Sequence, residues 1–197
     1  MTGGTERLKI ERLAIPDVVL VTPRRFGDTR GFFSETFCDR DMAAAGLPDR
    51  FVQDNHSRSE KAGTVRGLHM QAPPHAQAKL VRVSKGRILD VAVDVRVGSP
   101  TYGRHIAAEL SAENWTQILV PVGFLHGFAT LEPDTEVQYK VTDYYVPVAE
   151  GGVLWHDPDL AIEWQVKIAD ATVSARDKEL PRFRDWISPF KYDKGAQ

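Results

Sequence analysis

ILDVAVDVRV, residues 88–97, alternates between two kinds of side chain. One face takes Val91, Val93, Val95 and Val97, and the other takes Asp90, Ala92, Asp94 and Arg96. Successive side chains of a β-strand point to opposite faces, so this period of two predicts a strand. The same period recurs outward from this stretch, between residues 18 and 164, with Gly, Pro, Asn and Asp clusters separating the runs.

Further strands are predicted at residues 79–83, 105–110, 117–120 and 135–142. Only residues 40–46 are predicted as a short helix, which Gly46 and Pro48 end. Many short strands in a chain of 197 residues predict an all-β fold, an antiparallel sandwich or jelly roll whose mouth commonly holds a ligand.

The chain has no internal repeat or low-complexity linker, and its Gly and Pro residues are spread throughout. We therefore expect a single domain over residues 1–197, with its core at about 18–181 and a C-terminal tail at 182–197.

Composition excludes several classes of protein. Lys and Arg number 25 against 27 Asp and Glu, and the net charge of -2 gives no reason to expect nucleic acid or a membrane surface as a partner. Cys38 is the single cysteine, so no intramolecular disulfide can form, which suits a reducing compartment. The first 15 residues are too charged for a signal peptide, and no stretch reaches the roughly 18 apolar residues of a membrane span. We therefore expect a cytoplasmic location.

Two polar residues fall on apolar strand faces. Lys79 shares a face with Val81 and Val83, where an ammonium must be paired or serve a ligand, unless it lies at the rim and reaches solvent. Tyr139 shares a face with valines in the same way, as a core tyrosine or a site residue.

Two motifs carry histidines. Arg66-Gly67-Leu68-His69 puts a guanidinium and an imidazole three residues apart, which alone is a weak signal. The stretch PVGFLH, which ends at His126, resembles the second cupin motif, whose Pro and Gly shape a turn and whose His points into the barrel. The metal-binding first motif, a His-x-His pair followed by a carboxylate, is not matched. A metal site built from His69, His75 and His126 is left as an alternative.

In order along the chain, a series of motifs resembles the dTDP-4-dehydrorhamnose 3,5-epimerase family, from residue 18 to residue 181. These motifs are FGDTRGFFSE (26–35), FVQDN (51–55), RGLH (66–69), KLV (79–81), DVAVDVR (90–96), PVGFLHGF (121–128), YKVTDYY (139–145), WHDP (155–158) and SARD (174–177). The resemblance implies a cupin-type jelly-roll barrel and an isomerase that acts in dTDP-rhamnose biosynthesis without a metal or organic cofactor.

The family inverts carbons 3 and 5 of dTDP-4-dehydro-6-deoxy-D-glucose, which gives dTDP-4-dehydro-L-rhamnose. Both carbons flank a ketone, so a base removes a proton, charge moves to the ketone oxygen, and an acid returns a proton from the opposite face. By resemblance, His69 is the base, Asp177 orients it, Lys79 stabilises the enolate oxygen and Tyr139 is the acid. Imidazole suits the base role because its ordinary pKa of about 6.5 leaves a large neutral fraction at pH 7.

The resemblance also assigns substrate-binding positions, which are Arg30, Glu35, Gln53, Asn55, Arg66, His126, Glu150 and Arg176. Arg30 and Arg66 are the natural partners of the diphosphate, because guanidinium groups match phosphate oxygens. Family members exchange N-terminal strands between protomers. The resemblance therefore implies a homodimer in which Arg30 and Glu35 serve the neighbour's site.

Two departures and three alternatives accompany this reading. Arg176 stands where Lys is common, and His156 where Asn is usual. The alternatives are an epimerase that inverts only carbon 3 or only carbon 5, a metal-dependent cupin oxygenase, and a non-catalytic sugar-nucleotide binder or ketoisomerase relative. A binder has no need of a base and an opposing acid.

Overall fold

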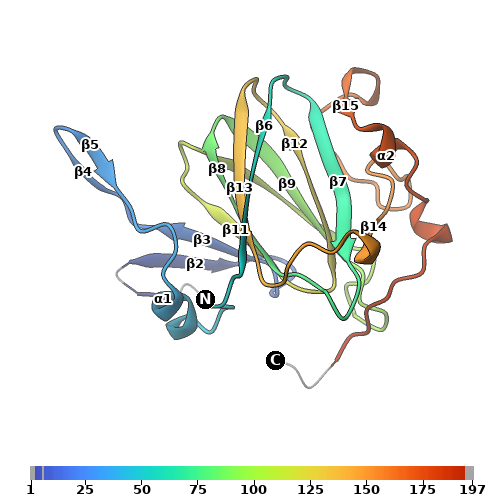
Figure 1. Cartoon of the computed structure of the whole chain (residues 1–197), viewed down its shortest axis with the longest axis horizontal. Coiled ribbons are helices and arrows are strands. Elements are labelled where there is room, and N and C mark those ends of the chain that lie inside the picture. Colours follow the sequence, from blue (N-terminus) through green and yellow to red (C-terminus); the bar gives the residue numbers. More distant parts are fainter. Residues whose placement is uncertain (1–2, 6, 194–197) are drawn as a thin grey trace.

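The computed structural model describes residues 3–5 and 7–193, and two β-sheets packed face to face form its body (Figure 1). The first sheet has the strand order β1 (Gly3–Thr5), β2 (Leu8–Arg12), β3 (Val19–Pro23), β11 (Gln117–Val120), β8 (Lys79–Lys85), β13 (Thr135–Val141) and β6 (Gln53–Ser59). The second has the order β10 (His105–Ser111), β9 (Arg87–Asp94), β12 (Phe124–Thr130), β7 (Thr64–Gln71) and β14 (Glu150–Gly152). A short strand, β15 (Thr172–Val173), pairs with β7 in parallel.

These sheets confirm the prediction of an all-β, cupin-type jelly roll. Each predicted strand is present, and β11 has the predicted bounds. The strand predicted at 88–97 ends earlier, at Asp94, because Arg96 folds back and donates to Asp94 Oδ1 from its backbone N and its Nε, both at 3.0 Å. The predicted helix is α1 (Asp39–Ala44), and the sequence reading missed a second one, α2 (Ala175–Lys178).

Both faces of β9 are buried, and they have different neighbours. Its valine face lies outside the sandwich, where Val91 and Val93 share a cluster with Trp155 and Trp164 of the C-terminal segment. The other face looks between the sheets, because Ile88 and Ala92 belong to a cluster with residues from both sheets. Asp90 alternates with these residues and therefore points into the sandwich.

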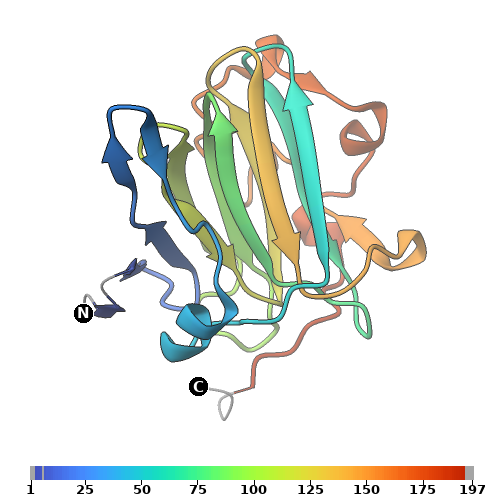
Figure 2. The same ribbon diagram turned by 60° about the vertical axis from the view of Figure 1, so that its left-hand side comes forward.

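The hairpin formed by β4 (Phe26–Asp28) and β5 (Gly31–Phe33) stands away from both sheets (Figures 1 and 2). It exposes three aromatic side chains, Phe26 by 45%, Phe32 by 54% and Phe33 by 66%. Three 3-10 turns, at Pro147–Ala149, Ile168–Asp170 and Phe183–Asp185, complete the named elements. In the described part of the chain, no helix has the length and apolar character needed to cross a bilayer.

Candidate active site

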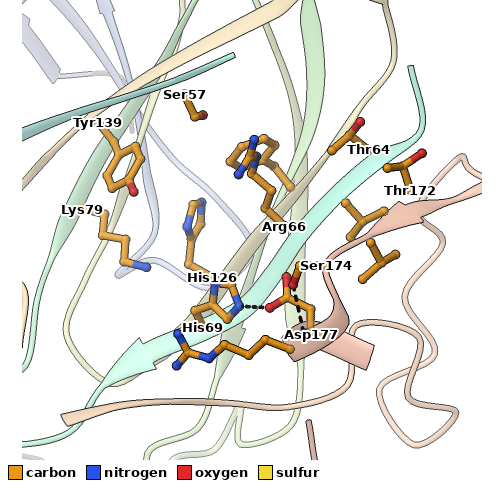
Figure 3. A pocket seen from close by; sticks show the side chains of 14 residues that line it. Ser57, Thr64, Arg66, His69, Lys79, His126, Tyr139, Thr172, Ser174 and Asp177 are labelled. Atoms are coloured by element: carbon orange, nitrogen blue, oxygen red, sulfur yellow. Dashed lines mark hydrogen bonds and ion pairs between the residues drawn. The ribbon is translucent and has the colours of Figure 1, made fainter. Parts of the chain in front are cut away.

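A pocket of about 500 Å³ lies between the two sheets (Figure 3). Its wall includes Arg66, His69, Lys79, His126, Tyr139, Arg176 and Asp177. A second hollow of about 300 Å³, lined by Gln53, Asn55, Tyr145 and Glu150 among others, adjoins it. His69, Lys79 and Tyr139 line both, so these three side chains stand where the two spaces meet.

An irregularity in β7 puts Arg66 and His69 on the same wall. Where β7 pairs with β12, His69 lies opposite His126 and Arg66 lies opposite Phe128. Three residue steps along β7 therefore face two steps along β12. Such a bulge shifts the alternation by one residue. Gly67 makes it sterically possible, because its φ is +125° and an added Cβ would lie 2.6 Å from Gly127 Cα. Regular alternation would have sent one of the two side chains out of the pocket.

His69 is hydrogen-bonded to a carboxylate from the C-terminal segment. Its Nε2 lies 2.8 Å from Asp177 Oδ1. Asp177 sits in α2, which Ser174 caps by accepting from the Asp177 backbone N at 3.0 Å. Burial alone would raise the pKa of Asp177, but hydrogen bonding to His69 and Gly67 lowers it overall. An ionised Asp177 holds the proton on His69 Nε2 and leaves Nδ1 as the basic nitrogen.

Lys79 and Tyr139 project from the opposite sheet, on β8 and β13. Among the described residues, no hydrogen-bond or ion-pair partner of Lys79 Nζ is present. Burial lowers the pKa of this ammonium to about 8. Burial also raises the pKa of the Tyr139 phenol, which therefore keeps its proton at neutral pH. The pocket thus sets a carboxylate-bound imidazole on one sheet against an ammonium and a phenol on the other.

His126 forms a second histidine–aspartate pair deeper in the sandwich. Its Nε2 lies 3.1 and 2.9 Å from the two carboxylate oxygens of Asp90, and both side chains are almost fully buried. Burial lowers the pKa of His126, so the ring is neutral. Asp90 was not among the site residues predicted from the sequence, although its place on the face of β9 opposite the valines was.

Hydrogen bonds and an ion pair link polar side chains at the mouth of the pocket. Glu150 Oε2 accepts from Tyr145 Oη and from Arg176 Nη1, each at 2.6 Å. Gln53 donates to Asn55 Oδ1 at 2.9 Å and accepts from the Tyr145 backbone N at 3.0 Å. These contacts connect the loop after β13 to α2, which carries Asp177.

Ten of the twelve predicted site residues therefore line the two adjoining spaces. The other two, Arg30 and Glu35, do not. Arg30 lies at the hairpin turn and pairs with Asp28, and Glu35 pairs with Arg7 at 2.6 Å. Within the described residues, no group of three or more His, Cys, Asp and Glu side chains has the arrangement of a metal site, and His75 pairs with Asp143 instead.

Comparisons with known proteins found similar sequences and structures. The family model described as dTDP-4-dehydrorhamnose 3,5-epimerase matches residues 12–185. Proteins of that name from Sinorhizobium fredii and Pseudomonas aeruginosa are 48% and 49% identical, covering 98% and 90% of this chain and 99% and 97% of their own. A crystal structure of a dTDP-6-deoxy-D-glucose-3,5-epimerase from Legionella pneumophila, in complex with dTDP-4-keto-L-rhamnose, superposes with a TM-score of 0.89 at 40% identity, covering 94% of this chain and 99% of that one.

Proposed function

This chain belongs to the dTDP-4-dehydrorhamnose 3,5-epimerase family, and we propose that it inverts carbons 3 and 5 of a dTDP-linked 4-keto-6-deoxy sugar with His69 as base and Tyr139 as acid. The observation that carries this proposal is the approach of the two side chains to one pocket from opposite sheets. Inversion requires proton removal and proton return on opposite faces of the sugar ring, which a base and an acid on facing walls can supply.

The proton transfers follow from the hydrogen bonds. His69 Nδ1 removes the proton from the carbon beside the ketone, and the resulting imidazolium is stabilised by Asp177 at Nε2. The electron pair of the broken C–H bond moves to the ketone oxygen, where the Lys79 ammonium stabilises the enolate. Tyr139 then donates its phenolic proton to the other face of the carbon. Once His69 has released its proton to solvent and Tyr139 has regained one, the same cycle serves the second carbon, because carbons 3 and 5 both adjoin the ketone.

Arg66 is proposed to bind the diphosphate. It lines the pocket, is held by Ser59 Oγ at 3.4 Å and by the Arg58 carbonyl at 3.3 Å, and has no carboxylate partner within ion-pair distance among the described residues. Its charge is therefore available to phosphate oxygens. Gln53, Asn55, His126, Glu150 and Arg176 are proposed to contact the rest of the substrate, because they line the same two spaces.

The function is tested by proton NMR of dTDP-4-dehydro-6-deoxy-D-glucose in deuterium oxide with the purified protein. We expect deuterium at carbons 3 and 5 and formation of the L-sugar. Deuterium at one carbon alone would show an epimerase that acts only at carbon 3 or only at carbon 5. Exchange at neither carbon would refute the proposal.

We also propose a homodimer in which the hairpin of each protomer completes the site of its partner. The exposed Phe26, Phe32 and Phe33 support this, because such an aromatic patch is suited to an interface. The strand β6, which carries Gln53 and Asn55, is the last strand of its sheet in the described part of the chain, so its outer edge can pair with another strand. Arg30 and Glu35 would then reach the neighbouring pocket.

A complementation experiment tests this exchange. Arg30→Ala and His69→Ala homodimers are each expected to be impaired. Co-expressed, they form mixed dimers in which one site has its own His69 and the partner's Arg30, which would restore about a quarter of wild-type activity under random pairing. If Arg30 served its own pocket, co-expression would restore nothing.

We also propose that the chain is a single domain with a cytoplasmic location. The sandwich takes strands from both ends of the sequence, from β1 at residue 3 to β15 at residue 173, which supports one domain. The single cysteine supports a reducing, cytoplasmic location.

A further inference from the structure

We propose that Asp90 is a positioning residue for this reaction, which holds His126 by one ring nitrogen and supplies the buried negative charge that the Lys79 ammonium requires. This inference rests on the proposed epimerase function. Asp90 has no exposed surface and is not among the residues that line either part of the pocket. It therefore acts through His126 and Lys79, which do line it.

The strand register brings the two residues together. Asp90 lies on the inward face of β9, and His126 lies on the inward face of β12 with Phe124 and Phe128. Phe128 is directly opposite Asp90 in this antiparallel pair, so His126 is its diagonal neighbour. Both oxygens of Asp90 turn to the same Nε2, at 3.1 and 2.9 Å.

This contact sets the tautomer of His126. An ionised carboxylate only accepts hydrogen bonds, so the proton of the neutral ring must be on Nε2. Nδ1 is then left as an acceptor. A ring fixed in this way can accept a hydrogen bond from a sugar hydroxyl, which fits the place of His126 in the pocket wall.

The charge of Asp90 is available to Lys79 because no Lys or Arg of the described residues lies within ion-pair distance of it. The groups that act on the ammonium or line the pocket with it are Asp90 from β9, Glu150 from β14, His126 from β12, Arg66 and His69 from β7, Tyr139 from β13, and Arg176 and Asp177 from α2. Of these, Asp90, Glu150 and Asp177 are carboxylates, and Asp177 is already hydrogen-bonded to His69 at 2.8 Å. Glu150 already binds the guanidinium of Arg176 at 2.6 Å, whereas the hydrogen-bond partner of Asp90 is a neutral imidazole. Asp90 is therefore the counter-charge that keeps Lys79 protonated against the effect of burial.

Asp90→Asn separates this role from a merely structural one. The variant keeps the size of the side chain and removes its charge, so the pKa of Lys79 should fall below about 8. If it falls by about one unit, the ratio of variant to wild-type kcat/KM is about fivefold lower at pH 8 than at pH 6. Taking this ratio at each pH cancels the titration of the base, which both proteins share.

The matched control is Asp94→Asn. Asp94 is another fully buried carboxylate on the same face of β9, but its partners are Arg96, Ser99 and Thr101, outside the pocket. Its substitution should change stability without a pH-dependent change in the activity ratio. A ratio for Asp90→Asn that is constant with pH, or one that Asp94→Asn reproduces, would overturn the proposal.

A measurement on the wild-type protein covers the case in which Asp90→Asn does not fold. The ¹⁵N chemical shifts of the His126 ring are expected to show the neutral Nε2–H form throughout pH 6–8. A neutral Nδ1–H form would overturn the proposal. Lack of wild-type turnover in the same assays would refute the epimerase function itself, and is therefore distinguishable from failure of this inference.

Discussion

The histidine–aspartate pairs His69–Asp177 and His126–Asp90 have nearly the same hydrogen bond and opposite surroundings. His69 and Asp177 are 2.8 Å apart, and the histidine side chain is 27% exposed to the pocket. His126 and Asp90 are 2.9 Å apart, and the corresponding exposure is 6%. Access to the substrate, rather than the pairing itself, thus separates a pair that can transfer protons from one that can only hold charge and orientation.

The strongest test of this contrast removes the exposed imidazole. His69→Ala should lower epimerisation by about 10⁴-fold and abolish solvent exchange at both carbons, because it removes the imidazole that takes the proton from each carbon. Proton NMR in deuterium oxide measures both quantities. The matched control is His75→Ala, since His75 pairs with Asp143 outside the pocket and should leave the rate unchanged. Wild-type exchange by the His69 variant would place the base elsewhere.

Tyr139→Phe should separate exchange from inversion. The base and Lys79 remain, so the enolate still forms and recovers deuterium through His69 on its original face. Formation of the L-sugar should fall by about 10², the usual scale for loss of a general acid. The check is the ratio of deuterium incorporation to L-sugar formed. If the L-sugar appears at the wild-type rate, another group is the acid, and Tyr145, which lines the adjoining space, is the first to examine.

Replacing the buried ammonium should stabilise the fold while it impairs the enzyme. Burial lowers the pKa of Lys79 from 10.5 to about 8, so below pH 8 the folded protein carries a charge that the unfolded chain solvates better. Lys79→Met should therefore raise the free energy of unfolding at pH 7 by about 2 kcal/mol. This is less than the full pKa shift would give, because water in the pocket screens the ammonium.

The gain in stability from Lys79→Met should depend on pH. Between pH 8 and 10.5 the unfolded wild-type chain binds a proton that the folded protein lacks, so wild-type stability rises with pH and the gain from Lys79→Met shrinks. Urea unfolding at pH 7 and pH 10 measures the difference. Lys85→Met, at the exposed end of the same strand, serves as control. An equal gain at both pH values, or none at pH 7, would contradict the buried-charge account.

The smallest expected effect is on substrate binding. Arg66→Ala should raise KM by about tenfold with little change in kcat, because a diphosphate contact is made equally in the ground state and the transition state. Steady-state kinetics separate the two constants. A large loss of kcat at an unchanged KM would assign Arg66 to the chemical step instead.

Alternation in the sequence predicted five of the fifteen strands of the described residues, which are β8, β9, β10, β11 and β13. It also selected Lys79 and Tyr139, because the neighbours that alternate with them on the inward faces of β8 and β13 are valines. It could not predict that Arg66 and His69 share a wall, because the bulge in β7 depends on pairing with β12. It also missed α2, which has only four residues and therefore shows no helical period. Family resemblance supplied Asp177, whose bond to His69 spans 108 positions.

The place of Asp177 also bears on the timing of activity during protein synthesis. A nascent chain that has emerged as far as Trp164 already contains every strand of both sheets except β15. It has the pocket's imidazoles, ammonium and phenol, but lacks the carboxylate that orients His69. Translation proceeds from the N-terminus, so the barrel can begin to form before α2 leaves the ribosome. Catalytic competence therefore comes late, when residues 172–177 dock against β7, because His69 lacks its orienting carboxylate before this point.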